Sequence, residues 1–126
     1  MTSVIALVDD LMFLSRIREA ARGSGVEVQG ARSVADLVEA AGPPPDLIVV
    51  DLDGGRLDGL AALRALRAAP RLAAVPAVGF LNHEEADRAR QAREAGCTRV
   101  LARGAFVREI GGLLRELAAD RTSPTG

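Results

Sequence analysis

Short apolar runs alternate along this chain with longer segments in which apolar residues recur every three or four positions. The runs resemble buried strands in length and in their branched residues, and they cover 4–8, 26–28, 47–50, 76–81 and 100–102. The periodic segments are typical of helices, and they cover 11–21, 33–41, a stretch around 60–66, 82–95 and 106–118. Five strands alternating with five helices predict an α/β fold, a doubly wound parallel sheet with helices on both faces.

Two capping-box spacings support the helix assignments. Ser33 stands three residues before Asp36, and Asn82 stands three residues before Glu85, so each pair is placed to begin a helix. We expect one domain over 1–119 and a flexible tail over 120–126.

Composition removes several classes of function. A net charge of −1 and a pI near 5.8 argue against a nucleic-acid surface built on basic residues. The sequence has no apolar run of the roughly 20 residues that a membrane span needs, so we expect a cytoplasmic protein. A single cysteine, Cys97, and a single histidine, His83, exclude an intramolecular disulfide and a four-ligand Cys/His zinc site. The chain contains no lysine, which excludes Walker-type phosphate loops and Schiff-base chemistry.

Acidic residues follow two of the predicted strands. Asp9 and Asp10 end the first strand, Asp51 ends the third, and Asp53 lies two residues further on. Carboxyl ends of parallel strands meet at one edge of a sheet, where ligands bind. Clustered carboxylates raise one another's pKa unless a cation neutralises them, and oxygen ligands suit Mg²⁺. A carboxylate beside Mg²⁺ can attack a phosphoryl group, so the pattern predicts an aspartyl phosphate. The alternative is that each acid caps a helix or is solvated.

At these residues the chain resembles the CheY-like receiver domain of bacterial response regulators, from about Ser3 to Leu114. The family pattern has an acidic pair and an aspartate at the end of a hydrophobic strand, and this chain has both. The loop that begins at Asp51 also has the family's length and ends, as in the family, in Asp-Gly. The matching residues are Asp9-Asp10, Asp51 to Gly59, Val75-Pro76 and Ala95-Gly96-Cys97.

The resemblance implies a flavodoxin/CheY-like (βα)5 fold with strand order 2-1-3-4-5. It implies that Asp51 is the phosphoacceptor, that Asp10 and Asp51 are Mg²⁺ ligands, and that Asp9 acts through water and Asp53 through its backbone carbonyl. The implied function is that of a stand-alone receiver in two-component or phosphorelay signalling, not an enzyme beyond its own phosphorylation and dephosphorylation.

The implied partners are a histidine kinase or phosphotransfer protein and a downstream protein bound through the fifth strand and last helices. Neither nucleic acid nor membrane is expected, and a homodimer is left open.

Three positions depart from the family pattern. Leu81 stands where the family has a Ser or Thr whose hydroxyl binds the phosphoryl group, and leucine has no donor or acceptor. Arg103 replaces the family lysine, and Val100 replaces the switch aromatic. An arginine can pair with a phosphoryl group, but its planar fork is not equivalent to an ammonium. These departures favour, as the alternative function, a protein-interaction module that works without phosphorylation.

A more distant alternative is a phosphatase of the haloacid-dehalogenase type, because the string from Val50 to Gly54 resembles that family's first motif. The acidic pair precedes the motif here, whereas that family needs one after it. Repeated hydrolysis of a generic phosphomonoester would distinguish a phosphatase from a receiver, which at most labels itself once.

The remaining polar residues have simpler interpretations. We predict that His83 is solvated in a first helical turn and that Cys97 is a buried structural thiol. Arg88, Arg90 and Arg93 alternate with acids and are expected to form a solvated helix face, with partner docking as the alternative.

Overall fold

The computed structural model describes residues 2–31, 33–39, 43–53, 58–81 and 86–122, and it describes the backbone alone for 39 and 117–122. Strands and helices alternate throughout. The elements are β1 (Thr2–Leu7), α1 (Leu11–Ala21), β2 (Val26–Ala31), α2 (Val34–Glu39), β3 (Leu47–Asp51), α3 (Gly59–Ala68), β4 (Ala77–Leu81), α4 (Ala86–Glu94), β5 (Arg99–Ala102) and α5 (Arg103–Thr122).

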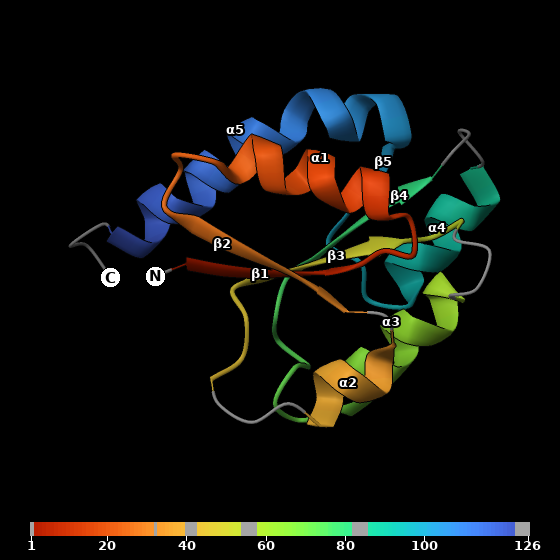
Figure 1. Cartoon of the computed structure of the whole chain (residues 1–126). Coiled ribbons are helices and arrows are strands. Elements are labelled where there is room, and N and C mark those ends of the chain that lie inside the picture. The colour runs from red at the N-terminus through yellow and green to blue at the C-terminus, as the bar shows by residue number, and fades with distance from the viewer. Residues whose placement is uncertain (1, 32, 40–42, 54–57, 82–85, 123–126) are drawn as a thin grey trace.

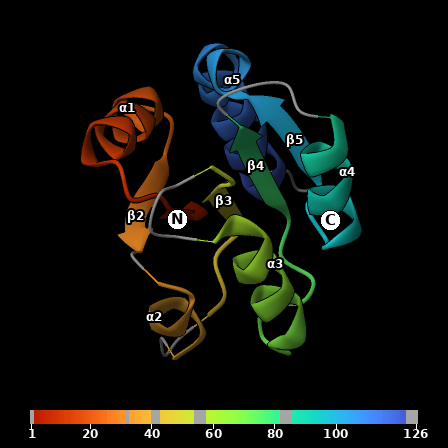
Figure 2. The same cartoon turned by 90° about the vertical axis from the view of Figure 1, so that its right-hand side faces the viewer.

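The five strands form one parallel sheet in the order β2-β1-β3-β4-β5. Helices α1 and α5 cover one face of the sheet, and α2, α3 and α4 cover the other (Figure 1). The predicted fold class and strand order are therefore confirmed. Because β3 is central, its five residues are all buried. Figure 2 views the molecule from the carboxyl ends of the strands, the edge at which Asp51 lies.

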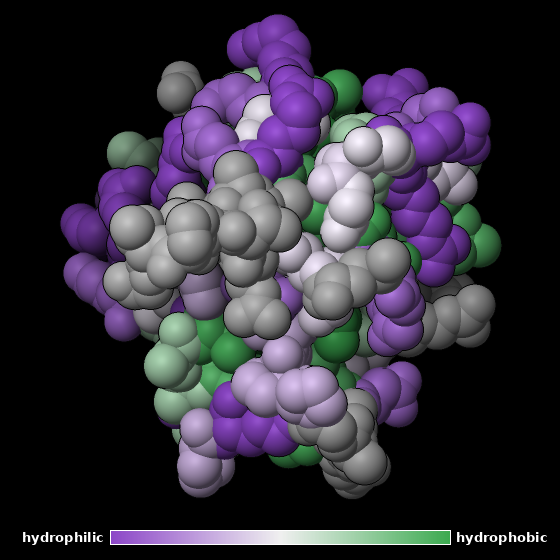
Figure 3. Space-filling view, turned by 90° about the vertical axis from the view of Figure 1, so that its left-hand side faces the viewer, coloured by the Kyte–Doolittle hydropathy of each residue, from purple (hydrophilic) through white to green (hydrophobic). Residues whose placement is uncertain are grey.

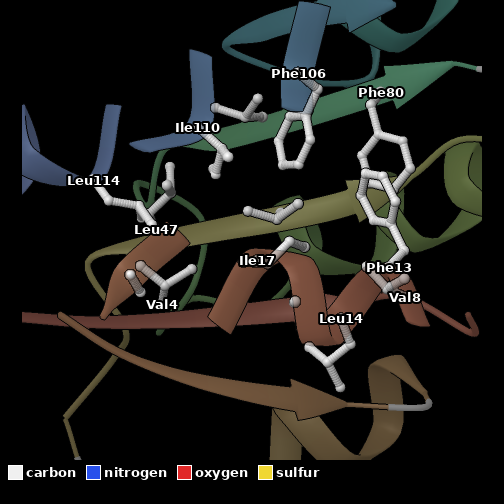
Figure 4. Packing of buried hydrophobic residues seen from close by; sticks show 14 residues of the cluster. Val4, Val8, Phe13, Leu14, Ile17, Leu47, Phe80, Phe106, Ile110 and Leu114 are labelled. Atoms are coloured by element: carbon white, nitrogen blue, oxygen red, sulfur yellow. The ribbon is translucent and has the colours of Figure 1, made fainter. Parts of the chain in front are cut away.

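Three phenylalanines stack in the core between the sheet and the α1–α5 layer (Figure 4). The ring centroids of Phe13 and Phe80 are 4.5 Å apart, those of Phe80 and Phe106 are 4.9 Å apart, and those of Phe13 and Phe106 are 5.6 Å apart. Such separations lie in the favourable range for aromatic pairs. The trio joins α1, β4 and α5 directly beside the edge that carries the acids.

The core on the other face is aliphatic. Leu52, Leu63 and Leu66 are fully buried there, and Cys97 is buried with them. Helix α4 contributes much less to this core than α3 does, since Ala92 is its one buried residue among those described. The attachment of α4 to the sheet therefore depends more on polar contacts than that of α3.

Helix α5 differs from the sequence prediction at both ends. It begins at Arg103, three residues before the expected 106, and continues to Thr122, past the expected end at 118 and into the predicted tail over 120–126. The Ser33 capping box is confirmed on one side, because Ser33 Oγ accepts a hydrogen bond of 3.2 Å from the Asp36 amide. The second capping box, at Asn82, lies outside the described residues.

Arg67 ties together three segments at the end of the molecule away from the acids. Its Nε and Nη2 donate to the carbonyl of Gly96, at 3.1 and 2.8 Å. Its Nη1 donates to carbonyls in the turn before β4, which belong to Leu72, Ala73 and Val75. Gly96 has φ +108° and closes α4, and a Cβ there would lie 2.7 Å from the Arg67 side chain. Glycine is thus required by both the backbone angle and the packing.

The outer sides of α1 and α5 are mostly polar, although Leu11 and Met12 in the first turn of α1 and Val107 in α5 are exposed. In Figure 3, which views the molecule from the side opposite to Figure 2, hydrophilic residues gather in the upper part, where these two helices lie. Of the helices described, none has the length and apolar character needed to cross a membrane.

Candidate functional site

Asp51 is the one buried acid among the described residues, only 4% exposed at the end of β3. Its Oδ1 accepts a hydrogen bond of 2.9 Å from the Asp53 amide. Burial raises the pKa of the Asp51 carboxyl above its ordinary value of 3.8, and the nearby charges of Asp53 and Asp9 raise it further. The Asp53 hydrogen bond and the Arg103 charge act in the opposite direction without cancelling the effect of burial. The fold thus holds a charged group where its charge is costly.

Arg103 supplies a positive charge at this site. Its Nη2 lies 3.8 Å from Asp10 Oδ2 and 4.0 Å from Asp51 Oδ2, so one guanidinium nitrogen bridges two carboxylates from different strand ends. Its Cζ lies 4.4 Å from the ring centroid of Phe13 and 5.6 Å from that of Phe80. A guanidinium is weakly hydrated and stacks on aromatic faces, which an ammonium does less well. The phenylalanine trio thereby fixes the position of the charge.

Asp10 has two roles. Its Oδ1 accepts hydrogen bonds from the amides of Met12 and Phe13, at 2.9 and 3.2 Å, and so caps the start of α1. Its Oδ2 faces Arg103. Asp10 therefore caps a helix, as the alternative interpretation of these acids predicted, and it also lies in the candidate site. Asp9 is half-buried, and its charge acts on Asp51.

The predicted metal ligands lie at one edge of the sheet, and their chemistry fits a divalent cation. Asp9, Asp10 and Asp51 offer carboxylate oxygens, and Asp53 offers a backbone carbonyl, which are hard ligands of the type that Mg²⁺ binds. Within the described ranges, no three His, Cys, Asp or Glu side chains are grouped closely enough to hold a metal as they stand. Arg103 is the cation in contact with Asp10 and Asp51, so a metal at these two carboxylates would have to share them with it.

Arg88 is a site residue that sequence reasoning missed. The prediction placed it on a solvated helix face, and this was wrong: its Nη2 donates a 2.9 Å hydrogen bond to the Leu52 carbonyl, and its Nε lies 3.3 Å from Asp53 Oδ1. Arg90 of the same helix does follow the prediction, since it is exposed and pairs with Asp87 and Glu94. A signal existed, because Arg88 stands four residues before Ala92 and residues four apart share one face of a helix.

The departures from the family pattern lie where the sequence predicted. Leu81 ends β4, is 2% exposed and packs in the aliphatic core, so no hydroxyl stands at that strand end. Val100 is half-buried in β5. Cys97 is buried as predicted, with Sγ 3.0 Å from the Arg99 carbonyl oxygen, and burial raises the pKa of its thiol. His83 lies outside the described residues.

The sequence matches no family model and no curated protein. Solved structures match over nearly the whole chain, and they are response regulators. The phosphorylated cyanobacterial phytochrome response regulator RcpA has a TM-score of 0.78 at 18% identity, with 99% of this chain and 96% of that chain covered.

Two further structures give the same result. The Mn²⁺-bound form of Rcp1 has a TM-score of 0.76 at 16% identity, covering 100% of this chain and 98% of its own. The chemotaxis response regulator CheY4 of Vibrio cholerae has a TM-score of 0.78 at 17% identity, covering 93% and 98%. This chain therefore has the fold of response-regulator receiver domains, as the resemblance in its sequence implied.

Proposed function

We propose that this protein is a receiver in two-component or phosphorelay signalling, and that Asp51 accepts a phosphoryl group from the phosphohistidine of a kinase or phosphotransfer protein. The observation that carries the proposal is the burial of an aspartate at the end of the central strand, next to an arginine and two further acids. Maintaining that arrangement costs stability, which is usual for functional sites. The fold shared with response regulators supports the same assignment.

The reaction is a phosphoryl transfer between two nucleophiles. A carboxylate oxygen of Asp51 forms the new bond to phosphorus, the bond between phosphorus and the donor imidazole nitrogen breaks, and its electron pair stays on the imidazole. The protein's own contribution is to position Asp51 through the Asp53 amide and to place the Arg103 charge beside it. A divalent cation held by Asp9, Asp10, Asp51 and the Asp53 carbonyl would neutralise charge on the phosphoryl oxygens.

Incubation with acetyl phosphate and Mg²⁺, followed by intact-protein mass spectrometry, tests the proposal. We expect the mass of one phosphoryl group to be added to the wild type and none to be added to Asp51→Asn. Asp58→Asn is the matched control, because Asp58 is an exposed acid that caps α3 through a 3.2 Å hydrogen bond from Ala61, and asparagine caps equally well. Labelling of Asp51→Asn, or no labelling of the wild type, would refute phosphorylation at Asp51.

A second candidate is a receiver-fold interaction module that works without phosphorylation. The buried Leu81 favours it, because the contact that a hydroxyl would make to a phosphoryl group is absent there. The Arg103 pairing favours it too, because the acids already have a cation. This candidate predicts no mass gain in the experiment above even though the fold is intact.

The phosphatase alternative is tested with p-nitrophenyl phosphate. A receiver releases one equivalent of nitrophenol when it labels itself and further product only as fast as it loses that phosphoryl group, whereas a phosphatase turns over continuously. We expect no release faster than the loss of the phosphoryl group.

The cellular partners in the proposal are a histidine kinase or phosphotransfer protein, together with a downstream protein that binds β5 and α5.

A further inference from the structure

Among the described residues, β4 ends without a side-chain donor at the site. Leu81 is fully apolar and belongs to the core beneath the sheet, so it offers nothing to an oxyanion on Asp51. A phosphoryl group brings three strong acceptor oxygens and a charge of about −1.5 to −2. A donor that reaches the site from another described element can therefore respond to it.

Arg88 is such a donor, and it reaches the site from α4. Its guanidinium contacts the two residues that directly follow Asp51: the Leu52 carbonyl, at 2.9 Å, and the Asp53 carboxylate, at 3.3 Å. The Asp53 amide in turn donates to Asp51 Oδ1 at 2.9 Å. The Arg88–Asp53 ion pair and the Asp53–Asp51 hydrogen bond thus connect α4 to the proposed phosphoacceptor.

The Arg88 side chain is held in place, but one of its N–H groups has no hydrogen-bond acceptor in the part of the chain that the structure describes. Its Nε is buried, and no described group accepts a hydrogen bond from it, although Asp53 lies within ion-pair distance. A buried N–H without an acceptor is costly, so a new acceptor placed near it gains the full benefit of pairing. Arg103 Nε is likewise buried without a described acceptor, but the Arg103 guanidinium is stacked over Phe13 and Phe80, and these rings hold it in place.

Helix α4 is weakly anchored, so a change at Arg88 can move it. Ala92 is its one buried residue in the described part of the chain, and Arg90 on its outer side pairs only within the helix. Elements with little buried surface are those that shift at low cost in free energy.

We propose, on the premise that Asp51 is the phosphoacceptor, that Arg88 is the residue that responds to phosphorylation: it exchanges its ion pair with Asp53 for the phosphoryl oxygens on Asp51 and moves α4 as it does so. The exchange is favoured because the phosphoryl group carries more charge than one carboxylate and matches the guanidinium fork. Arg88 then supplies from α4 the contact that Leu81 cannot make from β4.

The competing explanation is a structural ion pair that only fastens α4 to the loop after β3. The two explanations differ in what happens when Asp51 is modified. A structural pair stays with Asp53 and leaves α4 unchanged, whereas the proposed exchange changes the environment of α4 and strengthens binding at Asp51.

Beryllofluoride, which binds carboxylates and mimics a phosphoryl group, provides the test. The ¹⁵N-labelled protein in Mg²⁺ is titrated with beryllofluoride, and the amide resonances of α4 are followed by NMR. The variants are Arg88→Gln and the matched control Arg90→Gln, an arginine of the same helix that pairs with Asp87 and Glu94.

We expect the wild type and Arg90→Gln to bind alike and to show shifted α4 resonances. Arg88→Gln should bind about tenfold more weakly, the equivalent of one charge-assisted hydrogen bond, and should lose the α4 shifts. Arg88→Lys keeps the charge without the fork, so we expect the α4 shifts to fall by about half or more, and this variant keeps the test decisive if Arg88→Gln unfolds.

Equal affinity and equal α4 shifts in wild type and Arg88→Gln would overturn the role of Arg88 while leaving Asp51 as the acceptor. Failure of the wild type to bind beryllofluoride and to gain phosphoryl mass would overturn the proposed function and, with it, this role.

Discussion

Replacing Asp51 with asparagine should stabilise the protein while abolishing its proposed phosphorylation. The substitution preserves shape, and an asparagine Oδ1 can still accept the 2.9 Å hydrogen bond from the Asp53 amide. It removes a negative charge from a residue that is only 4% exposed. The question is whether that charge is stabilised by its surroundings or not.

The charges around Asp51 allow the balance to be worked out. Arg103 Nη2 is 4.0 Å from Oδ2, a separation at which two unit charges attract by about 4 kcal/mol at an effective dielectric constant near 20. That attraction is shared with Asp10 and is opposed by the charges of Asp9 and Asp53. Burial of an ion costs several kcal/mol, and the raised pKa of Asp51 shows that burial outweighs the attraction. Asp51→Asn should therefore raise the unfolding free energy by about 0.5–2 kcal/mol at neutral pH.

The pH dependence has a defined sign. The folded state holds the Asp51 proton more tightly than the unfolded state, whose carboxyl has a pKa near 3.8. Stability from this group is thus highest at acid pH and falls as the pH rises from about 3.8 through the raised pKa. The advantage of Asp51→Asn should be absent below that window and reach its full size above it.

Urea denaturation in the presence of EDTA, at several pH values, measures these effects without bound metal. Asp87→Asn, at an exposed acid of α4, is the matched control and should change stability by no more than about 0.5 kcal/mol. If Asp51→Asn lowered the free energy of unfolding by more than about 1 kcal/mol at neutral pH while Asp87→Asn left it unchanged, the reasoning would be refuted. Such a result would mean that the buried carboxylate is net stabilised by its partners.

Three further predictions concern packing around the site. Phe80→Ala removes the fully buried ring at the centre of the aromatic stack and should cost about 3–5 kcal/mol in urea denaturation, with a much smaller loss contradicting the packing. Gly79→Ala would place a Cβ 2.7 Å from Leu52 Cδ1 and 3.1 Å from Cys97 Sγ, so it should cost about 1–3 kcal/mol; unchanged stability would show that Leu52 can yield. Cys97 should react with iodoacetamide at pH 8 far more slowly in the native protein than in urea, because burial both shields the thiol and raises its pKa. Equal rates would show that β5 opens readily.

The fold was predictable because the pattern of short apolar runs and periodic segments maps directly onto a parallel α/β sheet. The place of Asp51 was predictable for the same reason, since it closes the apolar run 47–50. The start of α5 at Arg103 was not predictable, because residues 103–105 carry no apolar periodicity and tertiary contacts with Phe13 and Phe80 hold the first turn.

Arg88 escaped prediction because a charged residue among other charges has the pattern of a solvated face. Its spacing from Ala92 indicates the helix face on which Arg88 lies, but the contact that distinguishes it joins residues 36 positions apart, and that partner cannot be read from a local pattern. The stacking of Arg103 over aromatic rings was hidden in the same way: the three phenylalanines are scattered along the chain at 13, 80 and 106 and meet only in the folded state.

The network around Arg67 has a mechanical consequence for α4. This helix is about 13 Å long, and the carbonyl of Gly96 just beyond its last turn accepts hydrogen bonds from two guanidinium nitrogens of Arg67. Because these bonds hold the last turn in place, α4 is expected to move by tilting, with the largest displacement around Ala86 and the smallest around Glu94. A protein bound at the first turn of α4 would therefore contact the part of the helix that moves most, whereas a protein bound at the last turn would contact a part that hardly moves.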